Sequence, residues 1–498
     1  MGELELSLLD KQQHYRVYIR QLIFFDFPDP GKADAAFHAL RHGLAATLCR
    51  FPYLAGKASV RSDLPQGELR IQYPSPIHTS LESTRILNDQ MNFQKDAQLE
   101  YHLLKEKSFP PCTLPASTFC PFLLRHQVGL DDGDPYAEGP VSFTKRMPLP
   151  VFAAQATFIP GGLILSVWSL HALADGIGIS RVLETWSAEV RAFHQHFPQT
   201  SLMCKIPNTH RGDYNEEWLR CRYAVAEYDP SAPRRALAHY AHRANDKKPP
   251  KIFEDRPTLR RQPYGVATSV LRMSSYKISE LSSYLSVLTK DKVSPFVALA
   301  TLLWTHIIQA RLSLLQRLDD PTITLGVIAD LRRSVGYPYT APDFIGNLVR
   351  STESCVRLTT ASGILNRERP IVSRDMIVFA LKILDSIHAV TKDWTIDRLH
   401  ELKAYGQSDT AGVRYTNGPD LYITSWVKMG ADFEWDIPGT SSAKPAAIRR
   451  ASWVSEGGIT VLPRRKDTDA PFEVQISLAE DDLRSLIKSL RNGGWTLE

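Results

Sequence analysis

The sequence predicts an α/β protein with two domains of similar size. The chain has 498 residues, which is more than one hydrophobic core usually supports, so two cores are expected. Strand-like and helix-like segments alternate through both halves of the chain, and this alternation is typical of α/β folds. Residues 197–262 are rich in Pro, Arg, Lys and Asp and contain few long apolar runs, which indicates a linker between the halves.

These observations divide the chain into three parts. We predict a first domain over residues 1–205, a crossover linker over 206–262 and a second domain over 263–498. The two domains are loosely similar in length, but no sequence repeat relates them.

The first predicted domain begins with a strand and a helix. Residues 15–27 are rich in β-branched and aromatic side chains and end at a Pro-Asp-Pro-Gly turn, which predicts a strand. Residues 32–50 carry an apolar stripe at three- and four-residue steps, which predicts an amphipathic helix. Further strands are predicted over residues 57–60, 68–73, 151–158 and 163–170, the last two forming a hairpin.

The second predicted domain repeats the alternation. A very apolar helix is predicted over residues 295–311, with Ser294 as its N-cap and Pro295 as its first residue. Other helices are predicted over residues 279–288, 373–390 and 480–490. Strands are predicted over residues 266–273, 322–329, 421–427, 446–454, 458–462 and 472–478.

Composition and charge narrow the class of protein. Hydrophobic residues make up 43% and charged residues 23% of the chain, which are ordinary values for a globular protein. The net charge of +5 comes from interspersed acidic and basic residues, so nucleic acid is not an expected partner. A mildly basic chain of this kind suits an anionic small ligand.

Cysteine usage and hydropathy give an expectation for the compartment. The six cysteines form no C-x-x-C pair, which indicates reduced thiols. The start of the chain lacks the apolar core of a signal peptide, and no run of 18 uninterrupted apolar residues occurs. We therefore expect a cytoplasmic protein without a membrane span.

The best candidate for chemistry is the segment 163–180. Its apolar run predicts a buried strand that ends at His171, with Asp175 four residues later and Gly176 and Gly178 permitting a tight turn. Strand ends are where α/β folds expose reactive side chains to a crevice. A histidine there is either a general base or a hydrogen-bonded boundary residue, and the segment alone does not separate the two.

Other common catalytic signatures are absent from the sequence. It contains no P-loop, no G-x-S-x-G nucleophile elbow and no H-E-x-x-H metal motif. Proton transfer by a single histidine fits what remains, and we expect no metal site and no permanently bound cofactor.

The His171 motif is one of five stretches that share their order with the motifs of a known family. Residues 171–176 (HALADG) match H-x-x-x-D-G, and residues 432–435 (DFEW) match D-F-G-W-G. Residues 52–56 match P-L-A-G, 293–311 match the V-S-T…R-A-R helix, and 330–332 with 344–347 match D-x-R…Y-F-G-N. In this order they resemble the BAHD-type acyl-CoA-dependent acyltransferases. The ends of the chain are most similar to the fungal branch, which includes trichothecene and other secondary-metabolite O-acetyltransferases.

The resemblance implies a fold and an activity. The fold would be chloramphenicol acetyltransferase-like, with two domains of mixed β-sheet plus helices and an active-site channel at their interface. The activity would be transfer of an acyl group, with acetyl expected, from acyl-CoA to a hydroxyl of a secondary metabolite, without an acyl-enzyme. The expected partners are acyl-CoA and a small-molecule acceptor, and the expected state is a monomer.

The resemblance also implies roles at the reacting atoms. His171 would be the general base, a role that typically contributes about 10²- to 10⁴-fold to the rate. The Thr424 hydroxyl and the Trp426 indole N–H would donate to the tetrahedral oxyanion.

Other residues would support the site or hold the cofactor. Asp175 would pair with Arg332 and, together with Gly176, keep the loop in shape. The residues expected at the CoA phosphates, on grounds of position and charge, are Ser294, Lys292 and Arg449 with its neighbour Arg450.

One stretch departs from the family pattern, and other functions stay open. The two glycines of D-F-G-W-G are replaced by Glu434 and Asp436, which leaves the loop conformation and its cofactor contacts open. N-acylation of an amine is an alternative. A condensation-type domain fed by a carrier-bound thioester is another, although Leu170 stands where such domains usually carry a second His. A catalytically idle binding protein on the same fold is a third.

Overall fold

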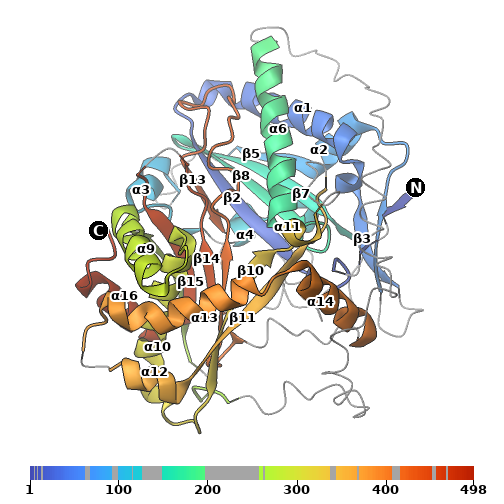
Figure 1. Ribbon diagram of the computed structural model, residues 1–498. Helices are drawn as coiled ribbons and strands as arrows, with labels where there is room; N and C mark the ends of the chain where they lie inside the picture. Colours follow the sequence, from blue (N-terminus) through green and yellow to red (C-terminus); the bar gives the residue numbers. More distant parts are fainter. Residues whose placement is uncertain are drawn as a thin grey trace. The chain divides into compact units, whose positions relative to one another are not determined.

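The computed structural model forms two compact units, each built from more than one part of the chain. Unit 1 comprises Met1–Tyr228, Pro338–Asn347 and Val427–Trp453, and unit 2 comprises Asp229–Tyr337, Leu348–Trp426 and Val454–Glu498. The structure describes residues 1–4, 6–7, 9–12, 15–61, 68–91, 99–114, 116–125, 148–196, 257–261, 264–336, 344–366, 369–405, 415–450, 456–466 and 469–497. The expected α/β class with mixed sheets and helices is confirmed (Figure 1).

The predicted boundaries need one correction. The prediction gave the whole of 263–498 to the second domain, whereas Pro338–Asn347 and Val427–Trp453 belong to unit 1. The reason is strand pairing: β13 (Ala447–Arg450) bonds antiparallel to β2 (Tyr18–Asp26), which lies near the other end of the chain. Sequence periodicity identifies a strand but not its partner. The predicted linker lies outside the described residues, apart from 257–261.

The described residues of unit 1 form two sheets. The larger has the order β13-β2-β8-β7-β5, and the smaller has the order β1-β4-β3-β6. The strands not yet located are β8 (Gly162–Leu170), β7 (Phe152–Ile159), β5 (Leu87–Met91), β1 (Gly2–Leu4), β4 (Glu68–Tyr73), β3 (Lys57–Arg61) and β6 (Leu149–Pro150).

The position of β8 in the middle of the larger sheet explains why its sequence is apolar. It bonds to β2 on one side and to β7 on the other, and every residue of β8 is buried. A strand covered on both faces reads as a continuous hydrophobic run rather than an alternating one. The predicted hairpin of β7 and β8 is confirmed, and its last residue leads directly into His171.

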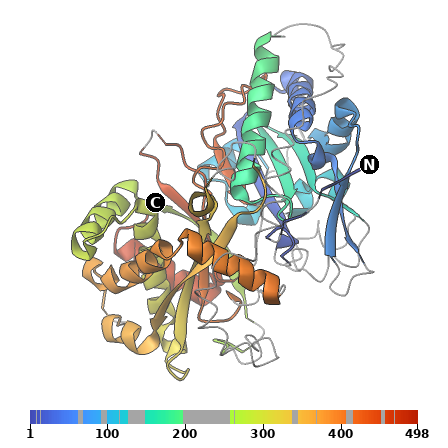
Figure 2. The same cartoon turned by 45° about the vertical axis from the view of Figure 1, so that its right-hand side comes forward.

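Helices of unit 1 pack on this sheet. α1 (Ala33–Arg50) and α6 (Gly176–His196) lie side by side, and both views show them together (Figures 1 and 2). The Trp186 indole of α6 donates to the Leu40 carbonyl of α1 at 2.9 Å and meets Phe152 of β7 edge to face. The shorter helices are α2 (Thr79–Ile86), α3 (Tyr101–Glu106) and α4 (Ala116–Phe119).

In the part of unit 2 that the structure describes, the strands form one mixed sheet with the order β11-β10-β12-β14-β15-β9. β10, β12 and β14 run parallel to one another, and the remaining pairs are antiparallel. The strands are β11 (Val349–Arg357), β10 (Thr322–Asp330), β12 (Leu421–Ser425), β14 (Gly458–Val461), β15 (Phe472–Ala479) and β9 (Val266–Met273).

The helices of unit 2 surround a very apolar one. α10 (Pro295–Leu315) starts as predicted, because the Ser294 side chain accepts from the Val297 main-chain N–H at 3.2 Å. By length and composition α10 is the one described helix that could cross a membrane, but 83% of its most apolar window is buried in the protein. The other helices are α9 (Ser275–Thr289), α11 (Arg332–Val335), α12 (Leu358–Ile364), α13 (Ile377–His388), α14 (Lys392–Tyr405) and α16 (Glu480–Asn492).

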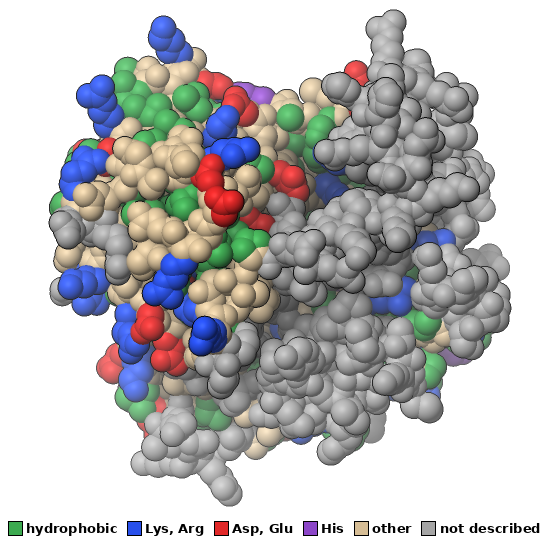
Figure 3. Space-filling model, turned by 90° about the horizontal axis from the view of Figure 1, so that it is seen from below, with side chains coloured by type: hydrophobic (Ala, Val, Ile, Leu, Met, Phe, Trp, Pro, Cys, Tyr) green, Lys and Arg blue, Asp and Glu red, His purple; other side chains and the backbone are tan. Residues whose placement is uncertain are grey.

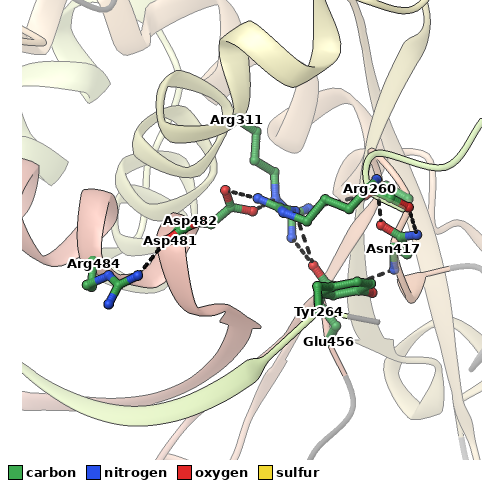
Figure 4. Close-up of polar contacts among 9 residues, drawn as sticks. Arg260, Tyr264, Arg311, Asn417, Glu456, Asp481, Asp482 and Arg484 are labelled. Carbon is green, nitrogen blue, oxygen red and sulfur yellow. Dashed lines mark hydrogen bonds and ion pairs between the residues drawn. The ribbon is translucent and has the colours of Figure 1, made fainter. Parts of the chain in front are cut away.

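A buried ion-pair network holds the core of unit 2 (Figure 4). Arg311 of α10 donates to Asp482 at 2.8 Å and to Glu456 at 2.9 Å, and each of the three side chains is at most 2% exposed. Arg260 also pairs with Asp482, and its backbone bonds to Asn417. Two arginines thus balance two carboxylates, and the network ties the segment before β9 to α10 and α16.

Charges on the described part of one face of the molecule are mixed in sign (Figure 3). On the described part of the face in Figure 3, Lys and Arg side chains lie among Asp and Glu rather than in one basic patch. This distribution matches the interspersed charges of the sequence.

Neighbouring acidic residues of α16 provide a test of the network. Asp482→Asn should lower the free energy of unfolding by about 3 kcal/mol, because it leaves the buried Arg311 and Arg260 without full compensation. Asp481→Asn removes the ion pair of Asp481 with Arg484, whose side chains are 81% and 72% exposed, and should leave the free energy of unfolding almost unchanged because water screens the pair. Denaturant unfolding followed by circular dichroism measures both. Equal costs would contradict the structural role of the network.

Candidate active site

His171 stands where the central strand of unit 1 ends. Its main-chain N–H donates to the Val17 carbonyl at 2.7 Å, which closes the pairing of β8 with the N-terminal segment. The chain then turns through buried residues to Asp175, whose side chain accepts from the Gly178 main-chain N–H at 2.9 Å. Asp175 is therefore the N-cap of α6. The geometry places His171 between a strand and a helix that are both fixed by hydrogen bonds.

Asn347 fixes the protonation pattern of the His171 ring. Its Oδ1 lies 3.0 Å from Nδ1 of His171, and its Nδ2 donates to the His171 carbonyl and to Asp10 Oδ1, each at 2.8 Å. Since both Nδ2 contacts are acceptors, the amide orientation is determined, and its oxygen faces the ring. Nδ1 of His171 must then carry the proton, which leaves a lone pair on Nε2.

The environment keeps the imidazole neutral. Burial is the largest influence and lowers the pKa of His171 below its ordinary value of 6.5, and the nearby charge of Arg450 acts in the same direction. The ring's local backbone hydrogen bond, the negative charge of Asp175 and the bond to Asn347 oppose this shift without reversing it. A neutral imidazole with a free Nε2 lone pair is the form that accepts a proton.

Tyr15 fixes the plane of the ring. The Tyr15 and His171 rings stack with centroids 4.4 Å apart and an angle of 17° between their planes. Tyr15 is 7% exposed, so it covers one face of the imidazole with a buried aromatic surface.

Gly178 permits the close approach of the segment that carries Asn347. A Cβ at position 178 would lie 2.1 Å from the Ile345 carbonyl oxygen. At Gly176 the nearest atom to an added Cβ would be the Met429 sulfur, at 3.0 Å. The sequence predicts a turn at these glycines, and the structure shows that Gly178 is needed for packing between α6 and residues 344–347.

The predicted oxyanion donors lie in unit 2. Thr424 is half-buried in β12, opposite Thr460 of β14. Trp426 follows that strand, is 6% exposed, and donates its main-chain N–H to the Val461 carbonyl at 2.8 Å. Both residues therefore stand at one strand end, and their roles stay predictions.

The predicted supporting and cofactor residues have different surroundings. Arg332 is 3% exposed and pairs with Asp330 at 3.0 Å, and its pairing with Asp175 stays a prediction. Ser294 caps α10, and Lys292 is exposed two residues before it.

Arg449 does not fit the cofactor role. It is 1% exposed, its guanidinium donates to the carbonyls of Ser108 and Phe109, and it lies over the Phe109 ring. Ser108 and Phe109 both have positive φ, so Arg449 stabilises an unusual turn after α3. The Arg449 guanidinium therefore binds carbonyl groups within unit 1, and these contacts disfavour the CoA contact that was predicted from charge alone.

The loop that departs from the family pattern is held by α6. Glu434 pairs with Arg191 at 2.6 Å, and the Asp436 carbonyl lies 2.7 Å from His194 Nδ1. Asp436 has φ of +47°, a conformation that suits glycine, while Trp435 between them is 1% exposed. Acidic residues thus replace the two glycines, and Arg191 and His194 of α6 bind these acidic residues.

Sequence reasoning missed three residues around His171. Asn347 falls in the matched F-I-G-N stretch, but a single sequence shows no reason for its role. Asp10 and Tyr15 lie near the N-terminus, and the only available signal was that Asp10 precedes the strand predicted over residues 15–27 and that Tyr15 begins it. Each acts through a contact distant in sequence, which periodicity does not report.

The fold and site define a transferase of two mixed-sheet units. The chain belongs to the Transferase family, whose model matches residues 140–491; a trichothecene 3-O-acetyltransferase-like N-terminal domain matches residues 17–189. The resemblance recognised in the sequence is confirmed.

Individual relatives match over almost the whole chain. A trichothecene 8-O-acetyltransferase of Fusarium sporotrichioides is 23% identical over 99% of this chain and 97% of its own. An acyltransferase of Emericella nidulans, easC, is 26% identical over 95% of this chain and 90% of its own. The crystal structure of F. graminearum TRI101 complexed with coenzyme A and deoxynivalenol has a TM-score of 0.74 at 16% identity, covering 100% of this chain and 99% of that one, and it shows the same fold.

Gly178→Ala tests the packing against Ile345. The added methyl group overlaps a backbone carbonyl, so α6 or residues 344–347 must shift, at a cost of about 1–3 kcal/mol. We expect a lower melting temperature. The control is Gly363→Ala in α12, where an added Cβ has no atom within 4 Å; it should be neutral or slightly stabilising. If Gly178→Ala melts like the control, the close approach is not needed.

Restoring the family glycines tests the acidic loop. Glu434→Gly with Asp436→Gly removes half-exposed charges but relieves the positive φ at 436, so stability should change by less than about 1 kcal/mol. Asp436→Val places a β-branched residue at positive φ and should cost about 1–3 kcal/mol. Thermal melting compares the variants. A collapse of the double glycine variant would show that the charged contacts are indispensable.

Proposed function

We propose that this transferase moves an acetyl group from acetyl-CoA to a hydroxyl group of a fungal-type secondary metabolite. The observation that carries the proposal is His171, held neutral and in the Nδ1–H form at the end of the central strand. Family membership and relatives named as O-acetyltransferases support the reaction class and favour oxygen over nitrogen as the acceptor atom. Solved relatives complexed with coenzyme A or ethyl coenzyme A support the donor.

The residues support a direct transfer. Nε2 of His171 takes the proton from the acceptor hydroxyl while the oxygen attacks the thioester carbonyl. The Thr424 hydroxyl and the Trp426 indole N–H stabilise the oxyanion of the tetrahedral intermediate. When that intermediate collapses, the carbon–sulfur bond breaks and the imidazolium returns the proton to the leaving thiolate. The products are the acetyl ester and free CoA, and the imidazole is neutral again.

The remaining assignments concern binding and surroundings. Asp175 and Gly176 shape the loop after His171, and Arg332 is proposed as the partner of Asp175. Ser294 at the start of α10, with exposed Lys292 two residues earlier, is proposed to meet the CoA phosphates, because a helix N-terminus and a cation both attract anions. The enzyme is proposed to act as a cytoplasmic monomer; among the residues that the structure describes, Cys49, Cys120 and Cys355 form no disulfide, which supports a reducing compartment.

His171→Ala tests the reaction itself. Purified protein is incubated with acetyl-CoA and a panel of trichothecene, eremophilane and ergot-alkaloid acceptors, and free thiol and acetyl ester are both measured. The variant should lose about 10²- to 10⁴-fold in kcat. The control is His78→Ala, at an exposed histidine that precedes α2, which should match the wild type. Full turnover in His171→Ala would exclude the mechanism, and acetylation of amines alone would favour N-acyltransfer.

The lowered pKa of His171 predicts the pH profile. A base works only when unprotonated, so kcat/KM should stay level as the pH falls through 6.5 and decline only below the lowered pKa. We expect the acid limb of a kcat/KM profile to have an apparent pKa below 6.5. An acid limb above 6.5 would contradict the buried, neutral imidazole.

A further inference from the structure

Asp10 closes the chain of hydrogen bonds that begins at the His171 ring. Its Oδ1 accepts from the Asn347 main-chain N–H at 2.9 Å and from the Asn347 side-chain Nδ2 at 2.8 Å. Both residues are fully buried, at 0% exposure. A buried carboxylate, an amide and the imidazole are therefore joined in sequence, and the carboxylate comes from the N-terminal segment.

The carboxylate of Asp10 is itself held in place. The Ser7 main-chain N–H donates to Asp10 Oδ2 at 2.9 Å, and the Asp10 main-chain N–H donates to Ser7 Oγ at 3.2 Å. One carboxylate oxygen thus faces Ser7 and the other faces Asn347. Every named partner of the carboxylate is a donor, so the site is built for an acceptor with two oxygens.

This arrangement determines which way the Asn347 amide points. If the amide were rotated by half a turn, its oxygen would face two acceptors, Asp10 Oδ1 and the His171 carbonyl. Its NH₂ group would then point at Nδ1 of His171 and would favour the tautomer with the proton on Nε2. That tautomer offers no lone pair at the position where the acceptor hydroxyl must lose its proton.

The same N-terminal segment also holds the ring by other means. Tyr15 stacks on the imidazole, and the Val17 carbonyl accepts the His171 main-chain N–H. Val17 therefore contacts the His171 backbone, Tyr15 covers one ring face, and Asp10 reaches the ring nitrogen through Asn347.

We propose that Asp10 is a positioning residue, which orients the Asn347 amide and thereby keeps His171 in the tautomer that can act as a base. The inference rests on the proposed function of His171 and adds a residue to that site. Asp10 does not touch the substrate, so its effect should appear in kcat and in the state of the ring rather than in cofactor binding.

Asp10→Asn is the direct test. A carboxamide cannot present acceptor oxygens to both Ser7 and Asn347, so one donor must face an NH₂ group. We expect kcat to fall about 10- to 100-fold, with KM for acetyl-CoA within about threefold of the wild type. The matched control is Ser7→Ala, which removes the hydroxyl from the same turn but leaves the carboxylate contacts in place. Wild-type kcat in Asp10→Asn would overturn the proposal.

The tautomer gives a readout that does not depend on turnover. In protein labelled with ¹⁵N-histidine, the His171 signals are assigned by their loss in His171→Gln, and their shifts distinguish Nδ1–H from Nε2–H. We expect Nδ1–H in the wild type and in Ser7→Ala, and a shift toward Nε2–H in Asp10→Asn. An unchanged tautomer in Asp10→Asn would overturn the inference. Because no acetyl transfer is needed, this result is separate from any failure of the proposed function in the His171→Ala assay.

A charge exchange keeps the test decisive should Asp10→Asn fold poorly. Asn347→Asp alone sets two carboxylates against each other, whereas Asp10→Asn with Asn347→Asp leaves a single carboxylate and so removes that repulsion, while the bond to the His171 carbonyl stays lost in both. We expect the double variant to exceed Asn347→Asp in kcat by roughly tenfold, as coupled neighbours do in a double-mutant cycle. A double variant no more active than Asn347→Asp would show that the two residues do not act together.

Discussion

The site of this transferase depends on how one buried amide uses its hydrogen bonds. Asn347 has two acceptors around its Nδ2 and one imidazole nitrogen beside its Oδ1. A buried polar group left without a partner costs about 1–3 kcal/mol, so only one orientation of the amide is stable. That orientation determines the protonation of Nδ1 of His171. The general-base chemistry that we propose at Nε2 would therefore be a consequence of hydrogen-bond matching, supported by burial of the ring.

The position of Asn347 depends in turn on backbone packing. The segment 344–347 lies against the start of α6 because Gly178 has no side chain there, and Asp175 caps the same helix turn. Shape and polarity thus act together: a missing Cβ allows the approach, and hydrogen bonds fix the final position. The region combines residues from the start, the middle and the last third of the sequence.

Buried charges are used for structure in both units. In unit 1 Arg449 binds carbonyl groups of an unusual turn, and in unit 2 Arg311 bridges two carboxylates. The D-F-E-W loop shows a related solution near the surface, where Arg191 and His194 bind the acidic residues that replace two glycines. Charge in a sequence therefore does not identify an anion-binding residue unless its burial and partners are also known.

Interactions between residues close in the sequence were sufficient to predict much of the fold. The continuous apolar run of β8 indicated a strand buried on both faces, and Ser294 with Pro295 marked the start of α10. The sharp end of that run identified His171 as the candidate base, and the order of the motifs identified the family. These features are properties of short segments, in which hydrophobic periodicity and capping act between near neighbours.

Only the tertiary structure decided the rest. The pairing of β13 with β2, the buried position of Arg449 and the contacts of Asp10, Asn347 and Tyr15 around His171 join residues far apart in the chain. The physical reason is that hydrogen-bond matching and close packing depend on which surfaces meet in three dimensions. A single sequence carries that information only through its folded form.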